Sequence, residues 1–173
     1  GKGKASIDGQ PLVLDHLKGS IAFESALLEN VVFENIGTVY TVENLTTFHT
    51  FNEPGLIIYL GGFSNHAKIQ LLGKLSHVAH DFRHFGDIDY GGFMIIDHLI
   101  RSTGIDIKPY RMDIGTLKTY GQYCKHIGND HRYMHKLESL LGLETLTSFQ
   151  DTIRYMISNK VILEQEAIVS SGY

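Results

Sequence analysis

Two aspartates, Asp87 and Asp89, stand one residue apart at the end of an apolar run, with glycines on either side. Asp and Gly are both unfavourable inside strands, so this stretch predicts the point where a buried strand ends and a loop begins. Strand side chains alternate with period two, which would direct both carboxylates to the same side. Neighbouring hard oxygen ligands suit Mg²⁺ or Mn²⁺. The pair therefore predicts a divalent metal site.

Two earlier strand ends carry residues that could complete such a site. Glu43 and Asn44 follow the β-branched and aromatic run 38–42, and a glycine pair, Gly61 and Gly62, ends the next apolar run. Ligands of open α/β sheets bind beyond the carboxyl ends of the strands. Glu43 can therefore share a metal with the aspartates if the two strands are neighbours. The glycine pair would let a phosphate approach the backbone closely.

Alternating strand and helix signals predict the framework that positions these residues. Apolar or β-branched runs of strand length occupy residues 38–42, 56–60, 82–86 and 105–110. Helical spacing separates the later runs, and such alternation implies parallel strands joined by right-handed crossovers. We therefore expect an α/β fold with a central, mostly parallel sheet flanked by helices, and further helices at the C-terminus.

Apolar residues at three- and four-residue intervals indicate where the helices lie. Ser64 is the expected N-cap of the helix that contains residues 71–75. A stripe over residues 117–127 predicts a helix that places Cys124 in the core. Ser148 and Asp151 form a capping-box pattern ahead of a terminal helix. Further helices are expected around residues 93–100 and 134–141.

The first 37 residues show no clean hydrophobic period. Residues 1–10 are polar and Gly-rich, and we expect a frayed or connecting end there. We expect residues 1–37 to be a lead-in or linker that packs on the core, and residues 38–173 to be the catalytic domain. The chain starts without Met, so we expect it to be part of a longer protein.

Composition limits the possible classes of protein. A chain of 173 residues with 43% hydrophobic content can bury one core. It has no apolar run long enough to span a membrane, and one cysteine excludes an internal disulfide framework, which fits a reducing, cytosolic setting. The formal charge of −4 argues against a broad nucleic-acid-coating surface, although acidic metal ligands contribute to that charge.

A strand-end Glu, then a glycine turn, then Asp-x-Asp resembles the Toprim domain of topoisomerases, DnaG-type primases and several nucleases. The sequences of residues 42–48, 59–63 and 86–93 narrow this resemblance, because they are similar to the C-terminal Toprim region of the Wadjet JetD proteins, a topoisomerase VI A-like group. Residues 163–166 are also similar to that family's C-terminal segment. The resemblance covers roughly residue 38 to the end and implies a Toprim-like (Rossmann-like) fold.

The resemblance implies a Mg²⁺- or Mn²⁺-dependent DNA endonuclease in which Glu43, Asp87 and Asp89 match the Toprim acidic residues. It further implies anti-plasmid defence in the bacterial cytoplasm, near the nucleoid, with double-stranded plasmid DNA as substrate and an SMC-type JetABC complex as partner. The family's N-terminal, DNA-engaging region is absent here, and we expect cleavage to need it. Homodimerisation is expected because two sites would cut two strands.

Hydrolysis needs charge neutralised on phosphate oxygens and an activated water, which metal ions held by the aspartates would supply. Glu43 would complete the coordination or act as general base. Five residues beside these strand ends are expected near phosphate or DNA: Asn44, Gly61, Gly62, Arg83 and His84. The resemblance also suggests that Glu164 or Glu166 approaches the site, whereas the residue type alone predicts that both lie on the surface.

Other interpretations remain open. Asp87 and Asp89 could form a plain turn, or the domain could be a non-catalytic DNA- or partner-binding module. A topoisomerase-type Toprim domain would need a tyrosine nucleophile, which no sequence feature marks. His131 and His135 have zinc-ligand spacing but equally suit a solvated helix. The position and context of the acidic pair do not match a phospho-acceptor receiver domain or a haloacid-dehalogenase-type phosphatase.

Overall fold

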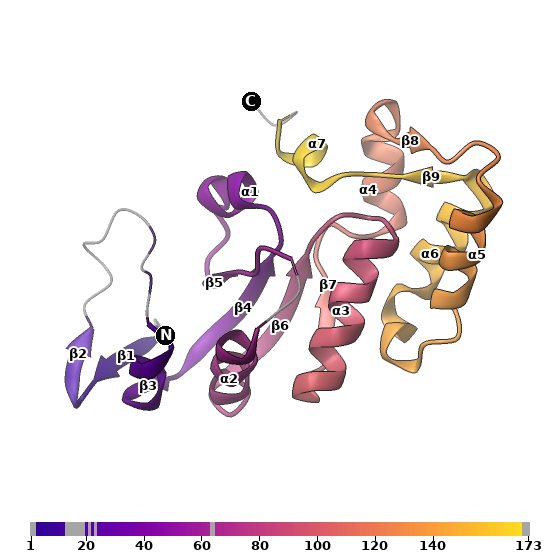
Figure 1. Ribbon diagram of the computed structural model, residues 1–173. Coiled ribbons are helices and arrows are strands. Elements are labelled where there is room, and N and C mark those ends of the chain that lie inside the picture. The colour runs from indigo at the N-terminus through magenta and orange to yellow at the C-terminus, as the bar shows by residue number, and fades with distance from the viewer. Residues whose placement is uncertain (1–2, 13–19, 21, 23, 63–64, 171–173) are drawn as a thin grey trace.

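Four parallel strands form the central sheet of the protein, and their spatial order is β5-β4-β6-β7 (Figure 1). The computed structural model describes residues 3–12, 20, 22, 24–62 and 65–170. The strands are β4 (Ile36–Val42), β5 (Leu56–Tyr59), β6 (Ala79–Phe85) and β7 (Ile107–Pro109). The expected parallel α/β sheet is thus confirmed, with β4 and β6 beginning two and three residues earlier than predicted.

Helices connect these strands. They are α1 (Leu45–Thr50), α2 (His66–Leu75) and α3 (Tyr90–Thr103), and α2 and α3 cover one face of the sheet (Figure 1). Apolar residues on alternate strand positions meet the two helices in one buried cluster, whose members include Val39, Phe82, Ile107, Leu72 and Leu99. The described residues contain no helix long and apolar enough to cross a bilayer.

The opposite face of the sheet carries an aromatic cluster near the strand ends. Tyr40 lies 4.9 Å from Phe51 and 5.2 Å from Tyr110, measured between ring centroids. Phe85 packs edge-on against Tyr110 at 5.6 Å. These rings pack against one another between the sheet and α1, so side chains lie on both faces of the sheet near the carboxyl ends of β4 and β6.

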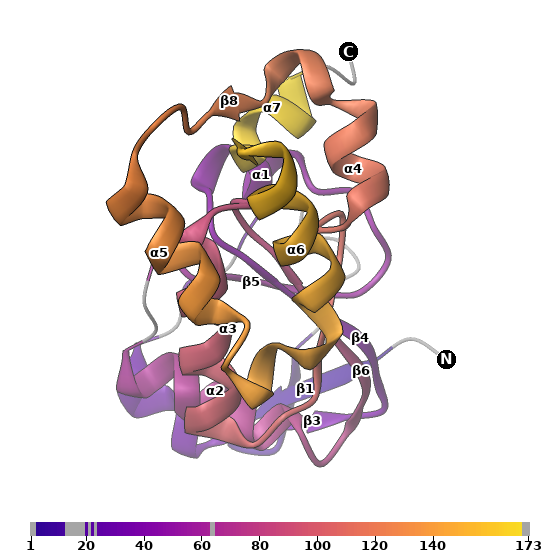
Figure 2. The same ribbon diagram turned by 90° about the vertical axis from the view of Figure 1, so that its right-hand side faces the viewer.

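A second layer of helices follows β7 and packs against α3 (Figure 2). Phe93 of α3 and Phe149 meet in its core at 5.8 Å. The elements are α4 (Ile114–Thr119), η2 (Gly121–Tyr123), β8 (Lys125–His126), α5 (His131–Leu140), η3 (Glu144–Phe149), α6 (Gln150–Asn159), β9 (Val161–Ile162) and α7 (Gln165–Ser170).

The last part of the chain returns to the central sheet. Strands β8 and β9 pair antiparallel, and the chain then forms a single bridge with the loop after β6. In that bridge Ile88 N–H donates to Leu163 O at 2.8 Å and Leu163 N–H donates to Ile88 O at 3.1 Å. These bonds hold residues 163–166 beside the aspartates.

The N-terminal residues contradict the expectation of a frayed end. Strands β1 (Lys4–Ile7), β2 (Gln10–Leu12) and β3 (Val31–Glu34) form an antiparallel sheet, with η1 (Ser25–Glu29) ahead of β3. Asp8 and Gly9 connect β1 to β2 with φ of 50° and 76°. Positive φ at both central residues is what a type I′ hairpin turn requires, and Asp-Gly supplies it.

Two helix predictions in the C-terminal layer are wrong in detail. The helix expected over residues 117–127 ends at Thr119, and Cys124 is extended and only half-buried. The apolar stripe still faces the core, but Gly121 and Gly128 disfavour a continuous helix there.

The two predicted caps differ as well. Ser148 and Asp151 form no capping box, because η3 runs directly into α6 and Phe149 occupies the N-cap position. Ser64 lies outside the described residues, and Asn65 caps α2 by accepting from Lys68 N–H at 3.1 Å.

The first turn of α3 lies against the backbone of Asp87. A Cβ atom on Gly92 would be 2.1 Å from Asp87 O, whereas one on the adjacent Gly91 would meet only the side chain of Asp89 at 3.4 Å. The absence of a side chain at residue 92 therefore brings the loop and the helix into contact.

We expect Gly92→Ala to lower the free energy of unfolding by about 1–3 kcal/mol, because backbone must move to admit the methyl group. Gly91→Ala is the matched control, and its higher helix propensity should leave stability unchanged or raised by up to about 1 kcal/mol. Urea denaturation measures both. Equal stability of the two variants would contradict the close approach.

Candidate functional site

The strand order defines where a ligand crevice can form. The chain moves from β4 to β5 on one side and then crosses to β6 on the other side of β4. Adjacent strands whose connections run in opposite directions form a topological switch point, where α/β sheets bind ligands at the carboxyl ends. Glu43 follows β4 and Asp87 follows β6, so both acids lie at the switch point.

The register of the two strands brings these acids together. Val42 pairs with Phe85, and Glu43 N–H donates to Phe85 O at 3.2 Å. Two residues after Phe85, Asp87 N–H donates to Glu43 Oε2 at 3.4 Å. The Glu43 carboxylate is thus held against the Asp87 backbone.

Gly86 makes room for this contact. A Cβ atom at this position would be 2.8 Å from Glu43 Oε2 and 2.5 Å from His84 Nε2. Any side chain here would displace the carboxylate or the buried imidazole. Gly86 therefore serves the site as well as the turn, because its lack of a side chain leaves space for the Glu43 carboxylate.

Burial sets the electrostatics of the two acids. It raises the pKa of the Glu43 carboxyl from its ordinary 4.5 to about 7, and the negative charge of Asp87 adds to the effect. Burial also raises the pKa of Asp87, against a hydrogen bond from Gln165 N–H that lowers it. Like charges held close in a partly dry site favour a proton or a cation between them.

Asp89 has a second task as the N-cap of α3. Its Oδ1 accepts from Gly92 N–H at 2.8 Å, so Oδ2 is the oxygen that the cap leaves unused. Among the described residues, no group of three or more His, Cys, Asp or Glu side chains lies close enough to hold a metal ion. The site is accordingly a close pair, Glu43 and Asp87, with Asp89 beside it.

This donor set fits a small hard cation. Mg²⁺ usually binds through one or two carboxylates and keeps water or substrate phosphate as its other ligands. Two carboxylates with raised pKa values supply that minimum, since a divalent ion would relieve their mutual repulsion. Glu43 and Asp87 would hold the ion, and Asp89 Oδ2 is the next carboxylate oxygen available.

Gln165 is a component of the site that sequence reasoning missed. Its side chain is fully buried, accepts from Asn44 N–H at 3.0 Å and donates to Phe85 O at 2.8 Å. Its own N–H donates to Asp87 Oδ1 at 2.7 Å. One residue thus joins the ends of both strands and orients the aspartate. A glutamine between Leu163 and Ile168, which are both buried, was the available signal.

The glutamates on either side of Gln165 are exposed, and both lie near the acids. Glu166 Oε1 accepts from Asn44 Nδ2 at 2.6 Å, and Glu164 forms an ion pair with Lys125 of β8. The charges of both glutamates raise the pKa of Asp87. Asn44 meanwhile caps α1 by accepting from Thr47 N–H at 3.1 Å, so its side chain has a structural role.

Tyr133 of α5 also reaches the site. Its hydroxyl oxygen accepts from Tyr90 N–H, directly after Asp89, at 3.1 Å. Burial raises the pKa of Tyr133, and the charges of Asp89 and Asp87 raise it further, so the phenol stays protonated. Its hydroxyl hydrogen remains a donor next to the acids.

The remaining predicted phosphate contacts are dispersed. Gly61 and Gly62 follow β5 with φ of 61° and 93°, as tight turns demand. Arg83 pairs with Asp81 at 2.7 Å on the sheet face opposite His84. His84 is fully buried, with Nδ1 2.8 Å from Thr41 Oγ1, and its Nε2 has no hydrogen-bond partner. The buried imidazole is therefore not exposed to contact phosphate in this structure.

The histidines considered as zinc ligands are exposed on α5. His135 pairs with Glu138 at 3.1 Å, and the described residues bring no third ligand to His131 and His135.

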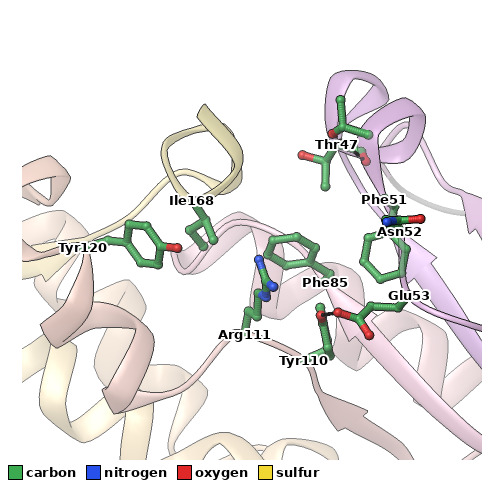
Figure 3. A pocket seen from close by; sticks show the side chains of 10 residues that line it. Thr47, Phe51, Asn52, Glu53, Phe85, Tyr110, Arg111, Tyr120 and Ile168 are labelled. Atoms are coloured by element: carbon green, nitrogen blue, oxygen red, sulfur yellow. Dashed lines mark hydrogen bonds between the residues drawn. The ribbon is translucent and has the colours of Figure 1, made fainter. Parts of the chain in front are cut away.

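A cavity of about 370 Å³ opens behind the acidic pair, beneath α1 and α7. Figure 3 shows Arg111 projecting between Tyr120 and Phe85, while Tyr110 donates to Glu53 at 2.6 Å. Glu43, Asp87 and Asp89 do not line it. The cavity is therefore lined by other residues than the three acids, although the end of β6 and α7 contribute to both places.

Comparisons with known proteins agree on one family. The family model described as "Wadjet protein JetD, C-terminal" matches residues 15–171. The Wadjet protein JetD of Bacillus cereus (strain Q1) is 28% identical over 172 residues, which cover 94% of this chain and 42% of that protein. The chain therefore spans about two fifths of the length of this curated relative.

Gln165→Leu should lower the free energy of unfolding by about 1–3 kcal/mol, because it leaves Asn44 N–H without a partner, while Phe85 C=O keeps only its bond from Glu43 N–H. Gln122→Leu is the control, since Gln122 is exposed on η2 and should change stability by no more than about 0.5 kcal/mol. Chemical denaturation compares the two. A Gln165→Leu variant as stable as the control would contradict the tie between the strands.

Glu43 predicts a pH dependence of stability. Between pH 4.5 and about 7 the folded protein retains a proton that the unfolded chain has lost. The free energy of unfolding should therefore fall as the pH rises through this window. Glu43→Gln should reduce that fall and make the variant more stable than wild type above pH 7. Denaturation from pH 4 to 8 measures this, with the exposed Glu29→Gln as control; parallel curves for wild type and Glu43→Gln would be the contrary result.

Proposed function

The chain belongs to the Wadjet JetD family, to whose C-terminal part it corresponds, and from this we propose that it is the metal-dependent, DNA-cleaving domain of such a protein. The reaction would be hydrolysis of a phosphodiester bond, with Glu43, Asp87 and Asp89 as the acidic centre and Mg²⁺ or Mn²⁺ as cofactor. A Toprim-like assignment of the sheet belongs to the same proposal.

The observation that carries the proposal is the placement of Glu43 and Asp87. They lie at the ends of adjacent parallel strands, at the switch point of the sheet, and Glu43 Oε2 is 3.4 Å from Asp87 N. Two raised carboxyl pKa values at one such position are typical of functional acids. A structural turn alone would not require a half-buried glutamate against the aspartate backbone.

A bound divalent ion would neutralise phosphate charge and make a coordinated water more acidic. The protein's own groups have separate tasks. Glu43 would complete the coordination of that ion or, as general base, accept a proton from the attacking water. Gln165 orients Asp87 through its N–H and fixes both strand ends. Tyr133 O–H can donate to a phosphate oxygen beside Asp89.

The wider role is proposed from the family. Substrate would be double-stranded plasmid DNA, the setting would be Wadjet defence in the bacterial cytoplasm, and the partner would be an SMC-type complex. Cutting both strands would call for two copies of the site, so a homodimer is part of this proposal.

A second candidate is a module that binds DNA or a partner without cleaving it. It is favoured by the finding that the described residues hold no preassembled group of three metal ligands. In that case the acidic pair would bind a cation that only bridges the domain to phosphate. Cleavage assays separate the two candidates.

Supercoiled plasmid incubated with the full-length JetD protein that carries this domain, together with Mg²⁺ or Mn²⁺, should be nicked, and EDTA should stop the reaction. Glu43→Gln and Asp87→Asn should each slow nicking by at least about 100-fold, because each removes charge that the reaction needs. Glu29→Gln, an exposed change elsewhere, should nick like wild type. No nicking by the wild type, or equal nicking by the site variants, rejects the nuclease proposal in favour of the binding module.

A further inference from the structure

One exposed stripe of α5 runs beside the acidic site. Arg132 and Lys136 are four residues apart, so they lie on the same side of the helix about 6 Å apart at Cβ. Both are exposed, and neither has a carboxylate partner among the described residues. Unpaired cations on adjacent turns concentrate positive charge on one surface.

The stripe is physically continuous with the acids. Lys136 Nζ lies 5.6 Å from the centroid of the Tyr90 ring, and Tyr90 directly follows Asp89. Tyr133, on the same helix, receives the Tyr90 N–H. A molecule bound at the acidic pair can therefore contact α5 without leaving the surface.

The charge balance of this region differs from that of the whole chain. Residues 125–136 contain three Lys or Arg, three His and a single acid, Asp130, in a protein of net charge −4. The carboxylate of Asp130 caps α5 by accepting from Tyr133 N–H at 3.0 Å. The single acid of this region is therefore occupied within the helix.

We propose that the α5 stripe, Arg132 and Lys136 with Tyr133, binds the phosphate backbone of the DNA duplex that enters the acidic site. This inference rests on the proposed nuclease function and adds the path of the substrate. Two cations on one stripe suit successive phosphates of one strand, and such contacts position DNA without reading its sequence. Tyr133 O–H would donate to the phosphate nearest Asp89.

The test measures binding of a fluorescein-labelled 20-base-pair duplex by anisotropy at several salt concentrations. Every sample carries Asp87→Asn, so that cleavage cannot interfere. Arg132→Glu with Lys136→Glu should weaken binding at least about 10-fold and reduce the slope of log K against log salt by about 1.8, the value of two phosphate contacts. The matched control reverses two exposed cations on α4 and α6, Lys118→Glu with Arg154→Glu, and should bind as the parent does.

Loss of affinity and slope in the α5 variant alone supports the proposal. Equal losses in both double variants, or none in either, overturn it, as does a parent protein that does not bind the duplex. The outcome is separable from that of the nicking assay. If the protein nicks plasmid but its α5 variant binds the duplex normally, the nuclease proposal stands and the proposed DNA path along α5 is rejected. If the α5 variant binds weakly but the wild type never nicks plasmid, the proposed DNA path stands and the nuclease proposal is rejected.

Discussion

The structure depends on one buried amide. Gln165 accepts from the backbone that leaves β4, donates to the backbone that ends β6, and donates its own N–H to Asp87. Without it, Asn44 N–H would have no partner and Phe85 C=O would keep only its bond from Glu43 N–H, and proteins rarely leave such polar groups unpaired away from water. The C-terminal layer is thus tied to the sheet at the point where the acids meet, and the rest of that layer can be understood as the support that brings residue 165 there.

Much of the framework could be predicted from the sequence. The continuous apolar run Leu56–Tyr59 predicted a strand correctly, but not one buried on both faces, because β5 lies at the edge of the sheet and only Ile58 of it is buried. The positions of Asp87, Asp89 and Glu43 at strand ends were predictable because they follow runs of strand-forming residues. Elements that depend on tertiary contacts were harder to predict. The stripe over residues 117–127 has helical spacing and packs against the core, yet the helix ends at Thr119, ahead of Gly121, which disfavours its continuation.

The missed residues of the site share a cause. Tyr133 and Gln165 lie on the C-terminal layer, and only the fold brings them to the end of β6. Long-range pairing of this kind leaves no periodic signal along the chain. His84 shows the opposite case: its neighbour Asp87 suggested a phosphate contact, but strand alternation buried the imidazole, while Arg83 was turned to the far face.

The hydrogen bond between Asn44 N–H and Gln165 joins residues 121 positions apart. During synthesis the strands and helices up to β7 leave the ribosome first, whereas residue 165 is among the last of the domain to emerge. Asn44 N–H, Phe85 O and the Asp87 carboxylate therefore lack this shared hydrogen-bond partner for most of translation. A nascent chain would carry the acids in a loose arrangement, and the centre would tighten only once the domain is complete. Under the proposed DNA-cleaving function, this order of assembly would delay a complete site until residue 165 has emerged.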